Sequence, residues 1–532
     1  MLTGCVPWPE DLATRYRNAG HWRGDVLSDL LREPAAGDPA RTAVVTGDGR
    51  YSYGELDDRA DRLAAGLADL GLEPGERVVV ALPNDVDFVV VCVALFRLGA
   101  VPVLGLVAHR RAELSYLVRS SGAVALVAPD AHHGFDHRAL AGEVAAESPT
   151  LRHVLIAGNA GGFTALADVT APPRTLPPPE PDEVAFFLLS GGTTGKPKLI
   201  PRTHDDYSYQ LRATAEAMRF GSGSTYLAAL PAGHNAALGC PGVLGALRAG
   251  GTVVLAGSPS PDEVFPLIAA EKPGLTTVMP AVLSLWLDTA PLFDVDTSGL
   301  VIEVGGAMLP PETAERVRTE LGATLTHWFG MAEGFLSFTR LDDPVERADT
   351  SQGTPMSPDD EIRIVDDEDL AVPDGETGQL LVRGPCVLRG YYDVPSHNAE
   401  VFTADGFLRT GDLVRRAPDG AITVTGRVKH TINRGGEKIS GDELETELAA
   451  HPAVRSVAVV PVPDPAFGEK TCAVVVPDGD PPTLAGLRAF LADRGVAGFK
   501  HPDRLRVVTS LPYTAVGKVD RRALAADATP EG

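Results

Sequence analysis

Apolar runs of strand length alternate with helical patterns along most of the chain. Residues 77–82 (RVVVAL) and 184–189 (VAFFLL) are continuous apolar runs, which is typical of buried strands. Residues 52–55 (SYGE) fit a capping box and predict a helix that runs from there towards Gly71. A strand at 300–304 followed by a helix over 311–321 repeats the unit. The alternation predicts an α/β fold with several layers and mostly parallel sheets.

The pattern changes near residue 427. Beyond it the chain shows short apolar runs and one clear amphipathic stretch, namely strands at 456–460 and 472–476 and a helix at 483–494. That content is enough for a small α+β domain. We therefore expect an N-terminal domain over 1–426, a hinge near Gly426 to Lys429, and a mobile C-terminal domain over 427–532.

Charge and cysteine content narrow the function classes. The 532 residues carry 47 Lys and Arg against 71 Asp and Glu, a formal net charge of −24. Such a surface repels polyphosphate and anionic lipid, so neither a nucleic acid nor a membrane is expected as a partner. The five cysteines are widely spaced without a C-x-x-C, which favours reduced thiols in a cytoplasmic protein. No apolar run approaches the roughly 20 residues that a membrane-spanning helix needs.

One loop combines glycines, hydroxyls and lysines directly after the apolar run at 184–189. Glycines let the backbone fold around an anion, while hydroxyls and lysines add donors and positive charge. A common phosphate-loop motif is excluded because it needs Gly at Ser190 and Ser or Thr at Pro197. The loop could also be an ordinary surface turn. The candidate phosphate-binding residues are Ser190, Gly191, Gly192, Thr193, Thr194, Gly195, Lys196 and Lys198.

Further motifs follow in a fixed order: 327–333 (HWFGMAE), 407–412 (FLRTGD), 426–427 (GR), 433–439 (NRGGEKI) and 517–518 (GK). With the loop, they make the chain resemble the acyl-adenylate-forming enzymes, which include acyl-CoA synthetases, peptide-synthetase adenylation domains and luciferases. Residues 199–207 (LIPRTHDDY) and 330–334 (GMAEG) are most similar to stand-alone aryl-acid adenylating enzymes, such as 2,3-dihydroxybenzoate–AMP and salicylate–AMP ligases. The resemblance implies activation of a carboxylate with ATP and Mg²⁺ to an acyl-AMP, and then transfer to a pantetheine thiol.

The resemblance also implies roles for individual residues. Lys518 would bridge the attacking carboxylate and the α-phosphate, and Lys438 would enter the site for thioester formation. Glu333, with Thr194, would hold Mg²⁺; a capping carboxylate is the alternative for Glu333. Asp412 and Arg427 would bind the ribose, and Phe329 would stack on adenine unless it is a core aromatic. The other candidates for the ATP site are Gly305, Gly306, Ala307, Gly330 and Met331.

Residues 233–240 (GHNAALGC) match the segment that builds the acyl pocket in this family. Amino-acid activators commonly place Asp where Asn235 stands, to pair with the substrate ammonium. A neutral amide cannot do this, but it can bond a hydroxyl ortho to the carboxylate, unless Asn235 is only a turn residue. The candidate pocket residues are His234, which is also a candidate catalytic residue, Asn235, Ala236, Cys240, Gly306 and Leu336.

Three of these residues differ from the dihydroxybenzoate pattern, which has Tyr, Ser and Val at the positions of Ala236, Cys240 and Leu336. Alanine removes a ring from the pocket wall, so salicylate alone would leave a void. We therefore expect an ortho-hydroxy aryl acid larger than salicylate, such as a hydroxynaphthoic or hydroxyquinaldic acid, activated in secondary metabolism. The thiol would be coenzyme A or the phosphopantetheine of an aryl carrier protein. A salicylate or 2,3-dihydroxybenzoate ligase of siderophore biosynthesis remains an alternative, and so does a catalytically silent nucleotide or aryl-acid binding protein.

Overall fold

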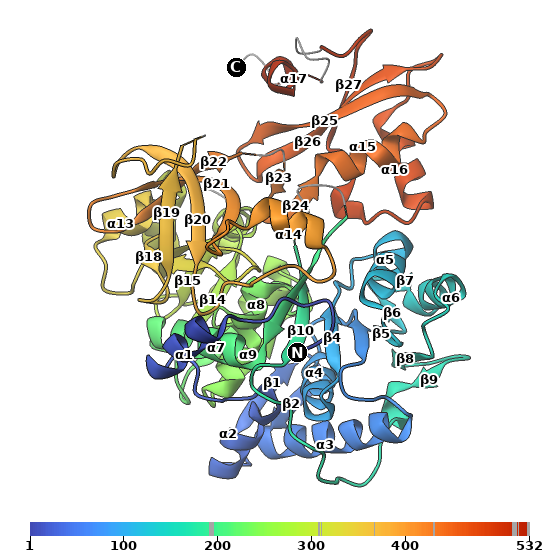
Figure 1. The fold of residues 1–532 in the computed structure, drawn as a ribbon, viewed down its shortest axis with the longest axis vertical. Coiled ribbons are helices and arrows are strands. Elements are labelled where there is room, and N and C mark those ends of the chain that lie inside the picture. Colours follow the sequence, from blue (N-terminus) through green and yellow to red (C-terminus); the bar gives the residue numbers. More distant parts are fainter. Residues whose placement is uncertain are drawn as a thin grey trace.

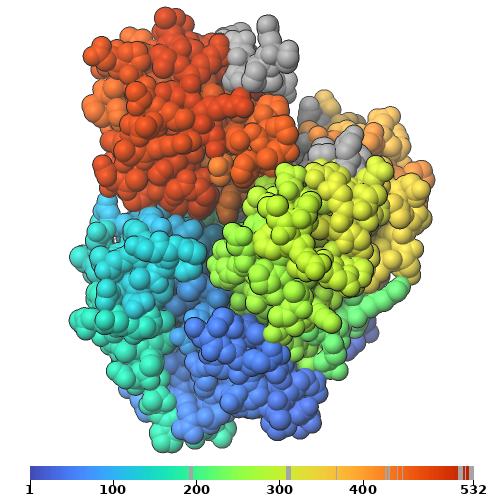
Figure 2. All heavy atoms as spheres, turned by 180° about the vertical axis from the view of Figure 1, so that it is seen from behind, coloured from blue at the N-terminus to red at the C-terminus, as the bar shows by residue number. Residues whose placement is uncertain are grey.

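The computed structural model describes residues 1–190, 196–306, 309, 311–366, 368–428, 431–512, 519 and 521–528. The chain forms a large body of three sheets with helices around them, and a smaller C-terminal lobe (Figure 1). Seen from behind, the lobe lies on the blue-to-yellow body as a separate mass (Figure 2). The expected α/β architecture with a small α+β lobe is confirmed.

The first sheet has seven strands, in the order β11-β10-β4-β3-β5-β8-β9. All pairs are parallel except β10 with β11. The apolar runs at 77–82 and 184–189 are two of its strands, and all strands are as follows: β3 Arg77–Val80, β4 Val101–Leu104, β5 Ala125–Pro129, β8 His153–Ala157, β9 Thr164–Ala165, β10 Val184–Leu189 and β11 Leu199–Thr203.

The second sheet has nine strands, in the order β18-β17-β16-β15-β14-β12-β13-β1-β2. Its centre is parallel, and both edges are antiparallel. Its strands are β1 Thr42–Thr46, β2 Gly49–Ser52, β12 Thr225–Ala228, β13 Thr252–Leu255, β14 Leu275–Val278, β15 Val301–Gly305, β16 Thr324–Gly330, β17 Leu336–Phe338 and β18 Thr354–Pro355.

Two further sheets are built mainly from antiparallel pairs. The third is wholly antiparallel and consists of β19 Glu361–Val365, β20 Thr377–Arg383, β21 Leu408–Arg416 and β22 Ile422–Arg427. The C-terminal lobe holds β23 Thr431–Arg434, β24 Glu437–Ser440, β25 Val454–Asp464, β26 Gly468–Pro477 and β27 Arg504–Val507. A short hairpin, β6 Ala131–His132 with β7 Phe135–Asp136, stands apart.

Helices cover the sheets, and several begin where the sequence predicts. The capping box at Ser52 and Glu55 opens α3, and Asp85 caps α4. The helix predicted over 311–321 is α12 followed by a π-helical turn at Val317–Leu321. The helices are α1 Glu10–Asn18, α2 Arg32–Gly37, α3 Tyr53–Asp69, α4 Val86–Leu98, α5 Arg111–Ser121, α6 His137–Glu147, α7 His204–Ala217, α8 Asn235–Gly239, α9 Gly242–Arg248, α10 Pro261–Glu271, α11 Pro280–Thr289, α12 Pro311–Arg316, α13 Val345–Thr350, α14 Pro395–Val401, α15 Gly441–Ala449, α16 Leu484–Asp493 and α17 Arg521–Ala528. Within the described ranges, no helix has both the length and the hydropathy that crossing a bilayer requires.

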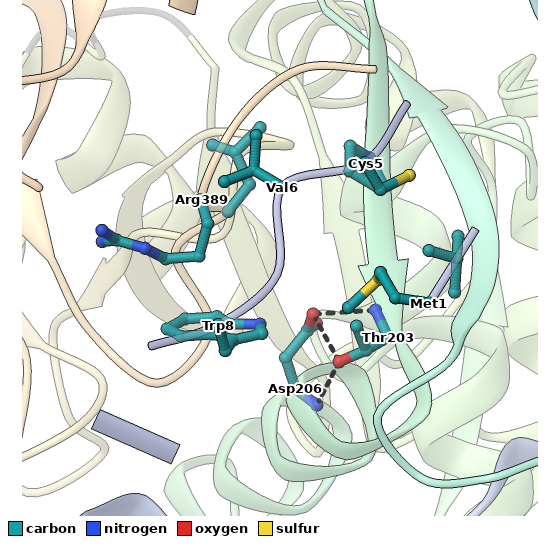
Figure 3. Close-up of a pocket in the computed structure, with 10 residues that line it drawn as sticks. Met1, Cys5, Val6, Trp8, Thr203, Asp206 and Arg389 are labelled. Carbon is teal, nitrogen blue, oxygen red and sulfur yellow. Dashed lines mark hydrogen bonds between the residues drawn. The ribbon is translucent and has the colours of Figure 1, made fainter. Parts of the chain in front are cut away.

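The N-terminal segment packs against the start of α7. Figure 3 shows Met1, Cys5 and Trp8 beside the capping pair of that helix, Thr203 and Asp206. The Thr203 hydroxyl donates to the Asp206 carboxylate at 3.0 Å, and its oxygen accepts from the Asp206 N–H at 3.2 Å. The cavity left between these residues is about 10 Å³, room for about one water. The side chains in this region therefore pack against one another, and the cavity between them is too small for a substrate.

Candidate functional site

The candidate site lies at the carboxyl ends of β15 and β16, where ligands of open α/β sheets commonly bind. A Cβ on Gly305 would lie 2.4 Å from the Trp328 ring, so only glycine fits at the end of β15. Gly306 has a φ of +81°, and a Cβ there would lie 2.5 Å from the Met279 sulfur. Trp328 and Met279 thus occupy the space that a side chain at either position would need, and the adenine and acyl roles of the two glycines stay predictions.

The segment after β16 makes a tight turn. The Met331 N–H donates to the Phe335 carbonyl at 3.1 Å, and a Cβ on Gly330 would lie 2.3 Å from Leu336. Phe329 is half-buried, with its ring 6.1 Å from the Phe335 ring. That position suits either a stacking surface or a core aromatic, so the adenine-stacking role of Phe329 stays a prediction.

Glu333 lies in this turn, so it has no helix to cap. Its Oε1 accepts a hydrogen bond from the Tyr391 hydroxyl at 2.8 Å, and its carbonyl accepts from the Leu388 N–H at 2.8 Å. Burial, and then the Glu333 charge, raise the pKa of Tyr391, which keeps that phenol protonated as a donor. The described residues contain no group of three or more His, Cys, Asp or Glu that could hold a metal by themselves. Glu333 therefore fits Mg²⁺ of the kind that is shared with substrate phosphates and water.

Asp412 lies on β21, with 3% of its surface exposed, opposite Arg427 in the register with β22. Its N–H donates to the Thr410 hydroxyl at 3.0 Å, and the Val428 N–H donates to the Gly411 carbonyl at 2.7 Å. The backbone thus brings Asp412 and Arg427 together as predicted, while the Arg427 side chain lies outside what is described.

The two ends of the predicted phosphate loop are closed on each other. The Lys198 N–H donates to the Ser190 hydroxyl at 2.9 Å, and the Ser190 N–H donates to the Lys198 carbonyl at 2.9 Å. Lys196 is exposed, with its ammonium 5.2 Å from the Tyr116 ring. Other predicted residues lie outside the described part of the chain: Gly191, Gly192, Thr193, Thr194, Gly195, Ala307, Lys429 and Lys518.

His234 caps α8 at the entrance to the expected acyl pocket. Its Nδ1 accepts from the Ala236 N–H at 3.4 Å. Burial, and then the charge of Lys438, lower the pKa of His234 to about 4, so the imidazole is neutral at physiological pH. His234 and Lys438 are 204 residues apart in the sequence, and the fold brings them within electrostatic reach of each other.

Asn235 is the first residue of α8 and only 8% exposed, so it is no surface turn residue. The Tyr207 hydroxyl donates to its Oδ1 at 2.9 Å. Burial raises the pKa of Tyr207 well above the usual value, so the phenol stays a donor. Because the amide oxygen is occupied, the NH₂ end of Asn235 is the end available to a ligand.

The remaining pocket residues are small or apolar and buried. Ala236, Cys240 and Leu336 are 2%, 1% and 0% exposed. The Cys240 thiol lies 3.6 Å from the Asn235 carbonyl, and burial raises its pKa, so it is uncharged. The structure thus brings Asn235, Ala236 and Cys240 into one buried segment, as expected.

A buried arginine, whose role the sequence pattern does not reveal, supports this segment. Arg202 is fully buried and donates to the Asp206 carboxylate at 2.9 Å and to the Gln210 side-chain oxygen at 2.9 Å. It also donates to the Ala332 carbonyl at 3.2 Å, next to Glu333. Gln210 donates in turn to the Gly239 carbonyl at 2.9 Å. Arg202 therefore connects the α8 segment to the turn that carries Glu333.

Glu303 is the second residue that was overlooked. It stands inside the apolar run at 300–304, is 0% exposed, and accepts from the Thr277 hydroxyl at 2.8 Å. Burial raises its pKa to about 8, while the Thr277 hydrogen bond acts in the opposite direction. A single carboxylate in a buried strand was the signal that could have revealed it.

The raised pKa of Glu303 predicts a pH-dependent stability. The folded state holds this proton more tightly than the unfolded chain, so the stabilisation is complete below about pH 4.5 and is lost as the pH rises towards 8. Relative to Glu303→Gln, the free energy of unfolding of the native chain should fall by up to about 1.4 kcal/mol per pH unit in that window. Urea denaturation of both proteins between pH 4 and 9 measures this. Parallel curves would contradict a protonated Glu303.

The C-terminal lobe reaches the site through the β23–β24 hairpin. The Asn433 side-chain amide donates to the Gly306 carbonyl, and a Cβ on Gly436 would lie 2.5 Å from the Met279 sulfur. A second contact lies at α5, where Lys500 is 3.4 Å from Glu113 and 3.0 Å from Glu443. The hairpin that carries Lys438 is thus docked on the β15 end.

Comparisons with known proteins identify the family of the chain. Residues 31–392 match the family "AMP-binding enzyme", and residues 443–518 match "AMP-binding enzyme C-terminal domain". The chain is 50% identical to 2,3-dihydroxybenzoate-AMP ligase of Bacillus subtilis (98% of this chain, 97% of that protein). It is 47% identical to 2-hydroxy-7-methoxy-5-methyl-1-naphthoate–CoA ligase of Streptomyces carzinostaticus (99% and 97%).

Among solved structures, the apo structure of MbtA from Mycobacterium smegmatis superposes with a TM-score of 0.77 at 47% identity, covering 98% of each chain. The expected resemblance, the enzyme class and the use of ATP with Mg²⁺ are thereby confirmed. The chain therefore belongs to the AMP-binding enzyme family, and within that family it groups with the aryl-acid AMP ligases.

Proposed function

We propose that this enzyme activates an ortho-hydroxy aromatic carboxylic acid larger than salicylate, such as a hydroxynaphthoic or hydroxyquinaldic acid. The observation that carries the proposal is the pair Asn235 and Ala236. The Asn235 amide, which accepts from Tyr207, offers its NH₂ to an ortho oxygen, and the buried Ala236 beside it lacks the ring that the dihydroxybenzoate pattern has at this position. The neutral Asn235, at the position where amino-acid activators carry Asp, disfavours an amino-acid substrate.

In the first half-reaction, the acid carboxylate attacks the α-phosphate of ATP and pyrophosphate leaves. Asp412 and Arg427 hold the ribose, and Gly305 and Gly306 let the nucleotide and the acyl group lie against bare backbone. Glu333 would hold Mg²⁺, which would supply positive charge to the phosphates. Lys518 brings a further charge to the reacting oxygens, and such electrostatic positioning is the main contribution to this type of chemistry.

In the second half-reaction, a pantetheine thiol attacks the aryl-AMP and AMP leaves. The docked β23–β24 hairpin brings Lys438 within electrostatic reach of a neutral His234, which supports a role for both residues in thioester formation. The acceptor is coenzyme A or an aryl carrier protein. We assign the mobile lobe to 427–532 with a hinge at Lys429. The five free cysteines suit a cytoplasmic enzyme.

Activation of 2,3-dihydroxybenzoate or salicylate for a siderophore is the second candidate, and the Bacillus subtilis relative favours it. The naphthoate–CoA ligase relative favours the bicyclic acid and coenzyme A. Acid-dependent exchange of pyrophosphate into ATP separates them, with salicylate, 2,3-dihydroxybenzoate, hydroxynaphthoates, hydroxyquinaldate and several amino acids as substrates. Exchange led by a bicyclic acid is expected. Exchange led by salicylate or dihydroxybenzoate would favour the siderophore candidate, and a silent binding protein would bind these ligands without exchange.

Filling the space at residue 236 should reverse the preference. In Ala236→Tyr, the added ring occupies the volume that the second ring of a bicyclic acid needs, so kcat/KM for bicyclic over monocyclic acids should fall about 10- to 100-fold. Exchange rates with 2-hydroxy-1-naphthoate and salicylate measure the ratio within one preparation. Ala237→Gly, at the next buried position, serves as the control. An unchanged ratio in Ala236→Tyr would remove the size argument.

A further inference from the structure

A layer of buried polar side chains lies on the face of the nine-stranded sheet that carries the pocket. Thr277, Glu303 and Thr326 are paired in register across β14, β15 and β16. Side chains alternate along each strand, and their neighbours Val278, Ile302, Val304 and Leu325 belong to the core on the opposite face. The polar layer thus shares its face with Trp328, Ala236 and Cys240, which belong to one core cluster.

Three polar atoms of this layer have no hydrogen-bond partner among the described residues: Glu303 Oε1, Thr326 Oγ1 and the indole nitrogen of Trp328. The other oxygen of Glu303 is already bonded to Thr277. An unpaired buried polar group costs about 1–3 kcal/mol, so three on one face are too expensive for simple packing. Groups of this kind normally meet a water or a ligand.

The layer is contiguous with the acyl pocket. After burial, the Glu303 charge is the next cause that raises the pKa of the Cys240 thiol, so the two side chains lie within electrostatic reach of each other. The Trp328 ring lies against Gly305, two residues along β15 from Glu303 and on the same face. The pocket is therefore bounded by Asn235 at α8 and by Glu303 and Trp328 at the sheet.

We propose that Glu303 and Trp328 form the far wall of the acyl site and select an aryl acid with a hydrogen-bond-accepting oxygen or nitrogen, such as a hydroxyl, a methoxy or a ring nitrogen, remote from the carboxylate. This inference rests on the proposed function and adds to it the chemistry of the outer ring.

The hydrogen bonds that these side chains can form determine which substrate groups they can bind. The indole N–H of Trp328 can only donate. Glu303 is protonated at neutral pH, and because Thr277 donates to Oε2, the acidic proton is left for Oε1. Two buried donors on one face of the sheet need acceptors, whereas a bare aromatic C–H would leave both unpaired. Sites built to bond a substrate heteroatom discriminate strongly against analogues without it.

Matched acids test the proposal through pyrophosphate exchange with the whole enzyme. The probes are 2-hydroxy-1-naphthoate and its 5-, 6- and 7-hydroxy and methoxy derivatives. We expect at least one derivative to exceed the parent acid about 10-fold or more in kcat/KM. In Glu303→Leu this ratio should collapse towards one, and in Glu303→Gln, whose amide still donates, most of it should be retained.

Each ratio compares two acids with the same enzyme preparation, so a loss of folded protein lowers both rates equally and cancels in the ratio. If Glu303→Leu does not fold, Trp328→Phe removes the second donor and should lower the same ratio. Ile302→Val, on the opposite face of β15, controls for perturbation of the strand. A native ratio near one for every derivative, or a ratio that survives both variants, would overturn this proposal and assign the layer to bound water. Absence of exchange with every acid would instead reject the proposed function.

Discussion

Replacing Gly436 with alanine will slow transfer of the acyl group to the thiol about 10- to 100-fold and leave acid-dependent pyrophosphate exchange nearly unchanged. A Cβ at this residue would lie 2.5 Å from the sulfur and 2.7 Å from Cγ of Met279, which is only 6% exposed. Overpacking of this kind costs about 1–3 kcal/mol. This destabilisation applies only while the β23–β24 hairpin is docked. We assign the docked state to transfer of the acyl group to the thiol, so transfer is the half-reaction that is slowed.

Gly479→Ala is the matched control for this experiment. Gly479 has a φ of +83° against +96° for Gly436, so alanine is similarly strained there, but its Cβ would meet nothing within 4 Å. Met279→Ala in the Gly436→Ala background removes the clashing atoms and should restore part of the transfer rate. Single-turnover release of AMP in the presence of coenzyme A measures transfer, and pyrophosphate exchange measures activation. Equal loss in both half-reactions would contradict the assignment of the docked hairpin to transfer.

Much of the fold was predictable because its signals are local. The capping box at Ser52, the run at 184–189 and the helix after Thr483 each depend on a few adjacent residues, and the structure places all three elements there. The antiparallel sheet of β19 to β22 was not predicted. Residues 384–407, which include α14, separate β20 from β21, so the pairing of these strands is decided by contacts between distant parts of the chain.

The site was predictable where motifs carry it and not where tertiary contacts create it. Glu333, Asp412, Asn235 and Lys438 stand in recognisable segments, and the fold brings His234 and Lys438 into electrostatic contact. Glu303 was counted only as part of an apolar strand, because its pairing with Thr277 joins two strands across 26 residues of sequence. Arg202 looks like a surface arginine in the sequence, and only packing reveals that it is buried.

Replacing that arginine has the largest effect on stability that we expect. Arg202→Met will lower the free energy of unfolding by about 3–5 kcal/mol, because it leaves the Asp206 carboxylate buried without its cation. The loss is not confined to one bond, since Arg202 also holds Gln210 and the Ala332 carbonyl. Acid activation should therefore fall even in the protein that remains folded. Urea denaturation and pyrophosphate exchange at a temperature below the unfolding transition measure the two effects separately.

Arg363→Met is the matched control for Arg202→Met. Arg363 also pairs with an aspartate, Asp405 at 2.6 Å, but the two side chains are 46% and 50% exposed. Solvent screens such a pair, so this variant should change stability by no more than about 1 kcal/mol and leave exchange unaffected.

The double variant Arg202→Met, Asp206→Asn removes both charges and should recover part of the stability, because no unpaired ion is left in the interior. If Arg202→Met behaves like Arg363→Met, the buried network does not carry the connection between the α8 segment and the turn at Glu333. If stability recovers in the double variant while exchange does not, the contribution of Arg202 to activity comes from positioning Gln210 and Ala332 and not from charge balance.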